Sequence, residues 1–345
     1  MENPANPLGL NGFEFVEFTS PDPEAMARQF EQLGFVPSHR HLSKNITRYK
    51  QGRINLMLNR DADGRVAQFR NEHGASASAM AFRVADPTLA MRWALDHGAQ
   101  PTMEDDTVIE GIGGSYLYFI QDGIDLYADW AEIPGWREAE AANNVGLDLL
   151  DHLTHNVRRG QMRVWSDFYK TLFGFEEQKY FDIKGQATGL FSQAMIAPDK
   201  AIRIPLNESQ DDKSQIEEFI REYHGEGIQH LALTTPDIFD TVERLRARGV
   251  KLQDTIETYY EFVDKRVPGH GEDLERLRKN RILIDGDVGD EGLLLQIFTE
   301  NMFGPIFFEI IQRKGNEGFG NGNFQALFES IELDQIRRGV IQVDA

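Results

Sequence analysis

Strand-like segments followed by amphipathic helices recur four times along this chain, and the repetition restricts the fold more than any other sequence feature. The four units span residues 12–35, 79–98, 149–175 and 229–249, and each helix ends beside a glycine. Glycine just past a helix is a common C-terminal stop. Further strand-like segments follow each unit, so the sequence predicts an α+β fold built from repeated βαβββ modules.

The modules predict two domains, each made of one pair. A chain of 345 residues is long enough for two domains with sizeable cores. We expect an N-terminal domain over residues 1–135, a linker over 136–147 and a C-terminal domain over 148–345. The linker is predicted because residues 137–144 are polar and show no strand pattern.

Charge and composition exclude several classes of function. A net charge of −20 disfavours binding to nucleic acids and to anionic membranes. The chain has no cysteine, which excludes disulfides and thiolate metal sites and fits a reducing compartment. No apolar run approaches the roughly 18 residues of a membrane helix. The start of the chain, residues 1–4, has no basic or apolar region typical of a signal peptide. We therefore expect a soluble cytoplasmic protein.

Two histidines and a glutamate interrupt apolar strand patterns in the second half of the chain. They are His152, His230 and Glu309. An ionisable side chain in a buried strand is costly unless a partner compensates it, and one metal ion compensates all three. Two imidazoles and one carboxylate form the ligand set of non-haem Fe(II) oxygenases. A hydrogen-bonded core histidine is the alternative for each histidine alone, and a buried ion pair is the alternative for Glu309. The equivalent places of the histidines in two modules favour the metal.

The repeat predicts one metal site, in the second half. At the corresponding points of the first half stand Glu17, near His152, and Met80, near His230. His155 alternates to the opposite face of its strand and is not expected to bind the same metal. We expect the six remaining histidines at the surface.

A hairpin is predicted within residues 293–311. Centred between residues 302 and 303, its register pairs Gln296 with Glu309 and Phe298 with Phe307. The pairing places an amide and two aromatic rings beside the metal, where they would suit an aromatic substrate. Simple core packing of the phenylalanines is an equal alternative.

The region near the C-terminus is glycine-rich over residues 318–324 and then opens a helix, with Asn323 as a suitable N-cap. Its apolar residues recur on one face. No strand leads into the glycines, so they do not form a dinucleotide-binding motif. The pattern alone favours a helix docked on the core over a glycine-hinged lid that closes on a pocket.

Several stretches carry a resemblance to a known family. They are DHLTHNV (151–157), YFDIKG (180–185), IPLNE (204–208), GEGIQH (225–230), LLQIF (294–298), FEIIQRKG (308–315), GFGNGNF (318–324) and LFESIE (327–332), with weaker likeness at 13–15, 48–52 and 80–84. The chain resembles the 4-hydroxyphenylpyruvate dioxygenase family, of the vicinal-oxygen-chelate superfamily. The likeness covers nearly the whole second half, whereas residues 120–145 are shorter than the family pattern.

The resemblance implies a site as well as a fold. His152, His230 and Glu309 would bind one Fe(II) per chain. The implied substrate pocket contains Ser192, Asn207, Gln215, Gln229, Gln296, Phe298, Phe307, Phe319, Asn323 and Phe324. Of these, Ser192, Asn207 and Gln296 would act in catalysis. The C-terminal helix would gate the pocket, and the chain would form a homodimer or homotetramer.

The implied reaction converts 4-hydroxyphenylpyruvate and O₂ to homogentisate and CO₂, in tyrosine catabolism. It combines oxidative decarboxylation, ring hydroxylation and side-chain migration. A 4-hydroxymandelate synthase would share the substrate and the ligands, but Asn207 and Phe298 fit the ring-hydroxylating pattern. An extradiol catechol dioxygenase would not explain the phenylalanine-rich C-terminal helix. A metal-free module that sequesters a small aromatic molecule is the alternative of a different class.

Overall fold

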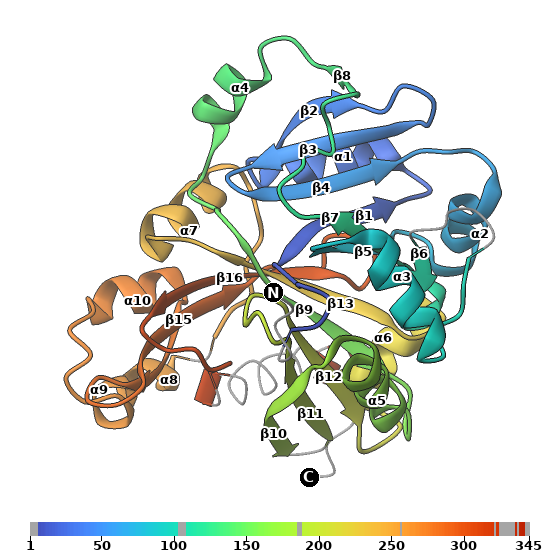
Figure 1. Cartoon of the computed structure of the whole chain (residues 1–345). Coiled ribbons are helices and arrows are strands. Elements are labelled where there is room, and N and C mark those ends of the chain that lie inside the picture. Colours follow the sequence, from blue (N-terminus) through green and yellow to red (C-terminus); the bar gives the residue numbers. More distant parts are fainter. Residues whose placement is uncertain are drawn as a thin grey trace.

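Two eight-stranded mixed sheets form the frame of the computed structural model (Figure 1). The structure describes residues 6–102, 108–184, 188–255, 257–320, 322–323, 335–336 and 338–341. Two sheets with flanking helices confirm the predicted α+β class. Phe324 and most of the predicted C-terminal helix lie outside the described residues.

The first sheet has the order β6-β7-β5-β1-β4-β3-β2-β8. Its strands are β1 (Phe13–Thr19), β2 (Val36–Arg40), β3 (Ile46–Gln51), β4 (Ile54–Asn59), β5 (Ser76–Val84), β6 (Val108–Glu110), β7 (Tyr116–Gln121) and β8 (Ala131–Glu132). Its helices are α1 (Pro23–Gln32), α2 (Gly64–His73), α3 (Pro87–Asp96) and the 3₁₀ turn η1 (Ile112–Gly114). The side chains of Asp22 and Asp86 cap α1 and α3, and each of these helices begins with a proline.

The second sheet has the order β10-β11-β12-β9-β13-β16-β15-β14. Its strands are β9 (Leu150–Val157), β10 (Glu176–Lys184), β11 (Gly189–Ile196), β12 (Arg203–Ser209), β13 (Gly227–Thr234), β14 (Leu283–Asp287), β15 (Gly292–Phe298) and β16 (Phe307–Lys314). The helices of this half are α5 (Met162–Phe173), α6 (Gln215–Tyr223), α7 (Ile238–Ala247), α8 (Thr258–Glu261), α9 (Val263–Arg266) and α10 (Leu274–Asn280). Helix α4 (Trp136–Asn143) falls within the predicted linker, and the exact domain boundaries stay a prediction.

The two halves share one continuous apolar core. The turn between β15 and β16 carries Phe303, which packs against Phe18 and Phe30 of the first half with ring centroids 5.4 and 5.2 Å apart. Beside it, Gln29 donates a hydrogen bond to the carbonyl of Met302 at 2.6 Å. The first half therefore anchors the hairpin that carries one of the predicted metal ligands.

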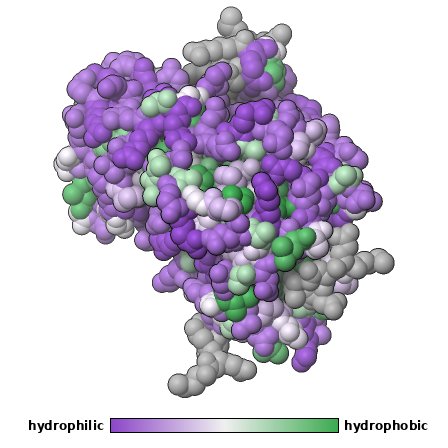
Figure 2. Space-filling model, turned by 90° about the horizontal axis from the view of Figure 1, so that it is seen from above, coloured by the Kyte–Doolittle hydropathy of each residue, from purple (hydrophilic) through white to green (hydrophobic). Residues whose placement is uncertain are grey.

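One histidine expected at the surface is buried instead. His73 ends α2, stacks on the ring of Tyr223 at 4.7 Å and lies with Nδ1 2.7 Å from the Tyr223 carbonyl oxygen. The prediction was wrong because this contact joins the ends of helices from different halves, which periodicity along one helix does not reveal. The face of the molecule in Figure 2 is mostly hydrophilic, with small scattered apolar patches. No helix among the described residues is long and apolar enough to cross a membrane.

Candidate metal centre and substrate pocket

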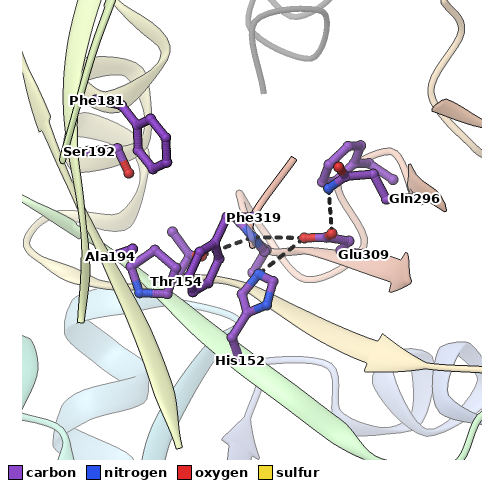
Figure 3. Close-up of a pocket in the computed structure, with 11 residues that line it drawn as sticks. His152, Thr154, Phe181, Ser192, Ala194, Gln296, Glu309 and Phe319 are labelled. Carbon is purple, nitrogen blue, oxygen red and sulfur yellow. Dashed lines mark hydrogen bonds and ion pairs between the residues drawn. The ribbon is translucent and has the colours of Figure 1, made fainter. Parts of the chain in front are cut away.

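Three neighbouring strands bring the predicted metal ligands together. In the sheet, Ala232 of β13 pairs with His152 of β9 on one side and with Glu309 of β16 on the other. His230 is two residues before Ala232 on β13, so its side chain points to the same face of the sheet as His152 and Glu309. The separation is 3.2 Å between His152 Nε2 and Glu309 Oε2, and 3.5 Å between His230 Nε2 and the same oxygen. The three side chains therefore converge on one point, as Figure 3 shows for His152 and Glu309.

The donor set and its spacing fit a single metal ion. Adjacent ligands at bond lengths near 2.1 Å lie about 3 Å apart, close to the two separations observed. All three residues are buried, with 2–4% of their surface exposed. Among the described residues they are the one group of histidine, cysteine or acidic side chains that could hold a metal, with ligand atoms within 4.8 Å of one another. Two imidazoles and a carboxylate suit Fe(II), and no cysteine is present to favour softer metals.

The protonation states of Glu309 and His230 also suit ligation. Burial alone would raise the pKa of Glu309, but the charge and hydrogen bond of His152 outweigh it and lower the pKa to about 2. Burial lowers the pKa of His230, so its ring favours the neutral form. An ionised carboxylate and a neutral imidazole are the forms that bind metals.

Neighbouring side chains orient both imidazoles. His152 donates from Nδ1 to Asp151 Oδ2 at 2.9 Å, which leaves Nε2 for a metal. Arg313 in turn holds Asp151 through two hydrogen bonds of 2.9 and 2.8 Å. His230 donates from Nδ1 to Gln229 Oε1 at 3.0 Å, and the Thr154 hydroxyl lies 2.9 Å from Nε2. Asp151 and Gln229 thus act through the ligands they orient.

Replacing Asp151 with asparagine is expected to weaken metal binding about 10–100-fold, because the neutral amide no longer fixes and polarises the His152 ring. Anaerobic titration with Fe(II) measures the effect. Asp264→Asn is the matched control, because Asp264 also bonds a histidine, His270 at 2.9 Å, but is exposed and distant from the ligands in sequence. Equal affinities for wild type and Asp151→Asn would contradict this role.

Metal affinity is also expected to depend on pH. Burial lowers the pKa of His152, but the charge of Glu309 and the hydrogen bond to Asp151 outweigh it and raise the pKa. A proton on Nε2 competes with the metal, so affinity is full above the raised pKa and falls about tenfold per pH unit below it. Fe(II) titrations between acidic and neutral pH test this, and an affinity that stays constant down to acidic pH would refute it.

A pocket of about 360 Å³, part of it open to solvent, lies over the three ligands. Besides the ligands, it is lined by Thr154, Phe181, Ser192, Ala194, Pro205, Gln296, Phe298 and Phe319. Figure 3 shows Phe181 and Ser192 on one side and Gln296 with Glu309 on the other. The ring of Phe319 lies 5.4 Å from that of His152. A metal centre below aromatic walls with a few polar groups is the form expected for an aromatic substrate.

The other predicted pocket residues that the structure describes lie outside this lining. Asn207 pairs with Ser192 across β12 and β11 and is 2% exposed. Phe307 stacks on His230 at 4.8 Å. Gln215 is the first residue of α6, and the Asn323 amide oxygen accepts a hydrogen bond from Tyr259 at 2.8 Å. None of these four residues lines the pocket in this structure, and neither does Gln229. Substrate contacts of all these residues remain predictions.

The predicted hairpin register was wrong by two residues. Gln296 pairs with Ile311, and Phe298 pairs with Glu309. The turn closes with a bridge between Phe303 and Ile306, so the centre moves towards the glycine and proline at its tip. A slip of two keeps every side chain on its face. Gln296 Nε2 consequently still donates to Glu309 Oε1, at 2.6 Å.

The structure adds residues that the sequence analysis did not single out. Thr154, Ala194 and Pro205 line the pocket, and Asp151 and Arg313 support His152. Thr154 shares strand parity with His152, so alternation could have identified it. His155 faces the other way, as alternation predicts, and bonds the Tyr169 hydroxyl at 2.7 Å.

The described residues of the first half form no second metal site. Glu17 is buried there and accepts hydrogen bonds from Ser78 at 2.8 Å and from Asn59 at 3.1 Å. Burial raises the pKa of Glu17. This glutamate is satisfied by neutral donors instead of histidines.

Comparisons with known proteins place these features in a family context. Residues 4–131 match the family model described as hydroxyphenylpyruvate dioxygenase, N-terminal. Residues 149–262 match the glyoxalase, bleomycin resistance protein and dioxygenase superfamily. The chain is 56% identical to 4-hydroxyphenylpyruvate dioxygenase of Pseudomonas aeruginosa, over 97% of both chains. It is 52% identical to hemolysin VllY of Vibrio vulnificus, over 99% of both chains.

Solved structures agree with the fold. A triple mutant of 4-hydroxymandelate synthase from Streptomyces coelicolor is similar with a TM-score of 0.83 and 26% identity, over 95% of this chain and all of that one. A fusion of a xylose isomerase-like TIM barrel with 4-hydroxyphenylpyruvate dioxygenase gives a TM-score of 0.80 and 28% identity, over 94% of this chain and 53% of the fusion.

Proposed function

The chain belongs to the 4-hydroxyphenylpyruvate dioxygenase family, and we propose that His152, His230 and Glu309 bind one Fe(II) ion beneath the pocket for that substrate. The chain is a dioxygenase that converts 4-hydroxyphenylpyruvate and O₂ to homogentisate and CO₂. The observation that carries the proposal is the convergence of the three ligands on one buried point under an aromatic-walled pocket. The absence of cysteine supports the cytoplasm as its location. By family resemblance, we also propose that it is a homodimer or homotetramer.

The overall reaction balances without any other reactant. The bond between the carboxylate and the keto carbon breaks and releases CO₂. One atom of O₂ enters the new carboxylate and the other becomes a ring hydroxyl, while the side chain moves to the neighbouring ring carbon. An Fe(II) ion held by His152, His230 and Glu309 would supply the activation of O₂.

The protein's part is to orient the substrate. Phe298 and Phe319 form apolar walls, so they hold the aromatic ring near the metal and exclude water from it. Gln296 donates to Glu309, which fixes the carboxylate and leaves the buried amide oxygen without a partner among the described residues. Ser192 and Asn207 bind the phenol end, away from the ligands. None of these roles requires a nucleophilic side chain.

The closest rival is a 4-hydroxymandelate synthase. The identity of 26% to that enzyme is far below the 56% to a 4-hydroxyphenylpyruvate dioxygenase. Both enzymes need a metal and a pocket for the same acid, so the product decides between them. Incubation of the anaerobically Fe(II)-loaded protein with 4-hydroxyphenylpyruvate and O₂, followed by chromatography and mass spectrometry, is expected to give homogentisate. Formation of 4-hydroxymandelate, or no O₂ uptake, would overturn the proposal.

A further inference from the structure

A row of paired residues crosses four strands beside the pocket, and its members on β9, β12 and β11 are polar. In the sheet, Asn156 of β9 pairs with Asn207 of β12. Ser192 of β11 pairs with Asn207 on one side and with Phe181 of β10 on the other. Directly paired residues point to the same face, with Cβ atoms about 5 Å apart. Ser192 and Phe181 line the pocket, so the whole row belongs to the pocket face of the sheet.

Asn156 is the polar member of this row that has no assigned role. It has the same strand parity as His152 and Thr154, both of which line the pocket. Its neighbour His155 points to the opposite face and bonds Tyr169. The side chain of Asn156 therefore lies on the substrate side of β9.

The amide of Asn156 is buried without a partner. Its residue is 0% exposed, and neither its oxygen nor its nitrogen has a hydrogen-bond partner among the described residues. The amide oxygen of the adjacent Asn207 is in the same condition. Most buried polar groups are hydrogen-bonded, and an unsatisfied one destabilises the fold. The missing partners of these two adjacent amides are explained if the amides form their hydrogen bonds with a bound ligand.

The position of the row indicates which part of a ligand it meets. Asn156 is four residues from His152, which is about 13 Å along an extended strand. The paired residues Ala194 and Pro205 line the pocket between His152 and Asn156. Phe298 and Phe319 add aromatic surface to this pocket. A ligand that fits has one polar end at the metal, an apolar middle and a second polar end at the row. Because the polar members of the row are two amides and a hydroxyl, all without charge, they suit a neutral group that both donates and accepts hydrogen bonds.

We propose that Asn156 is a specificity-determining residue that binds the para-hydroxyl of the substrate ring and so discriminates against arylpyruvates without that hydroxyl. The proposal rests on the proposed function and deepens it. A pocket built to bind a hydroxyl rejects the analogue that lacks it, because its buried polar groups are then left unpaired.

The test uses Asn156→Leu, which keeps the volume of the side chain but removes both polar atoms. Equilibrium binding of 4-hydroxyphenylpyruvate and of phenylpyruvate is measured anaerobically on the metal-loaded protein. The preference for the hydroxylated acid is expected to fall about tenfold or more in the variant. The melting temperature of the ligand-free variant is expected to equal or exceed that of wild type, because an unsatisfied amide has been removed.

His155→Gln is the matched control, since it changes the adjacent buried residue on the opposite face and is expected to leave the preference unchanged. An unchanged preference in Asn156→Leu would overturn the proposal. A drop in its melting temperature would also do so, because that result would mean that the amide is satisfied within the fold. If wild type binds neither acid, the proposed function fails. If wild type prefers the hydroxylated acid and Asn156→Leu does so equally, the inference alone fails.

Discussion

Glu309→Ala is expected to lower the affinity for Fe(II) about 10²–10³-fold and to abolish the formation of homogentisate. Metal sites with four protein ligands bind with about 10–16 kcal/mol, so one ligand contributes about 3 kcal/mol or more, which corresponds to a factor of at least about 10². Glu309 is the single anionic ligand of the three, and Gln296, which donates to it at 2.6 Å, would lose its partner. Anaerobic Fe(II) titration and a product assay measure the two effects.

Glu300→Ala is the control for Glu309→Ala, because Glu300 is an exposed acidic residue that follows β15. It is expected to bind Fe(II) and to turn over substrate as wild type does. If Glu309→Ala retained wild-type affinity, Glu309 would not be a ligand, and the buried carboxylate would need another explanation.

Phe303→Ala is expected to destabilise the protein by about 3–5 kcal/mol, the usual cost of removing a large aromatic side chain from a packed core. Phe303 is 1% exposed and its ring contacts Phe18, Phe30 and Phe308 with centroids 5.2–5.5 Å apart. The cavity would open between the two halves and would loosen the hairpin that carries Glu309. Urea unfolding at equilibrium, read by far-ultraviolet circular dichroism, measures the change.

The matched control for the core variant is Phe262→Ala, because Phe262 is 57% exposed. A surface change of this kind is expected to alter the free energy of unfolding by no more than about 0.5 kcal/mol. A loss below about 1 kcal/mol in Phe303→Ala would contradict the inference that the hairpin tip anchors one half to the other.

The repeat and the metal ligands could be predicted from the sequence because both depend on local rules. Alternation along a strand places His152 and His155 on opposite faces whatever the rest of the fold does. The equivalent positions of His152 and His230 in two modules follow from the same pattern. The structure bears out the convergence of these histidines with Glu309.

Features that depend on packing between distant segments could not be predicted. The salt bridge between Asp151 and Arg313, with Nη2 and Oδ2 2.8 Å apart, joins residues far apart in the sequence, and no periodicity marks it. His73 is buried only because α2 of one half ends against α6 of the other. The hairpin register slipped by two because it depends on the local form of the turn around Phe303, which strand patterns do not fix.

We propose that this chain inserts both atoms of O₂ into 4-hydroxyphenylpyruvate at the centre formed by His152, His230 and Glu309. The most direct test is mass spectrometry of the product formed by the Fe(II)-loaded protein under ¹⁸O₂. We expect homogentisate with one labelled oxygen in the carboxylate and one in the new ring hydroxyl. Homogentisate whose ring hydroxyl is unlabelled even at the shortest reaction times, or a labelled product hydroxylated on the side chain, would contradict it.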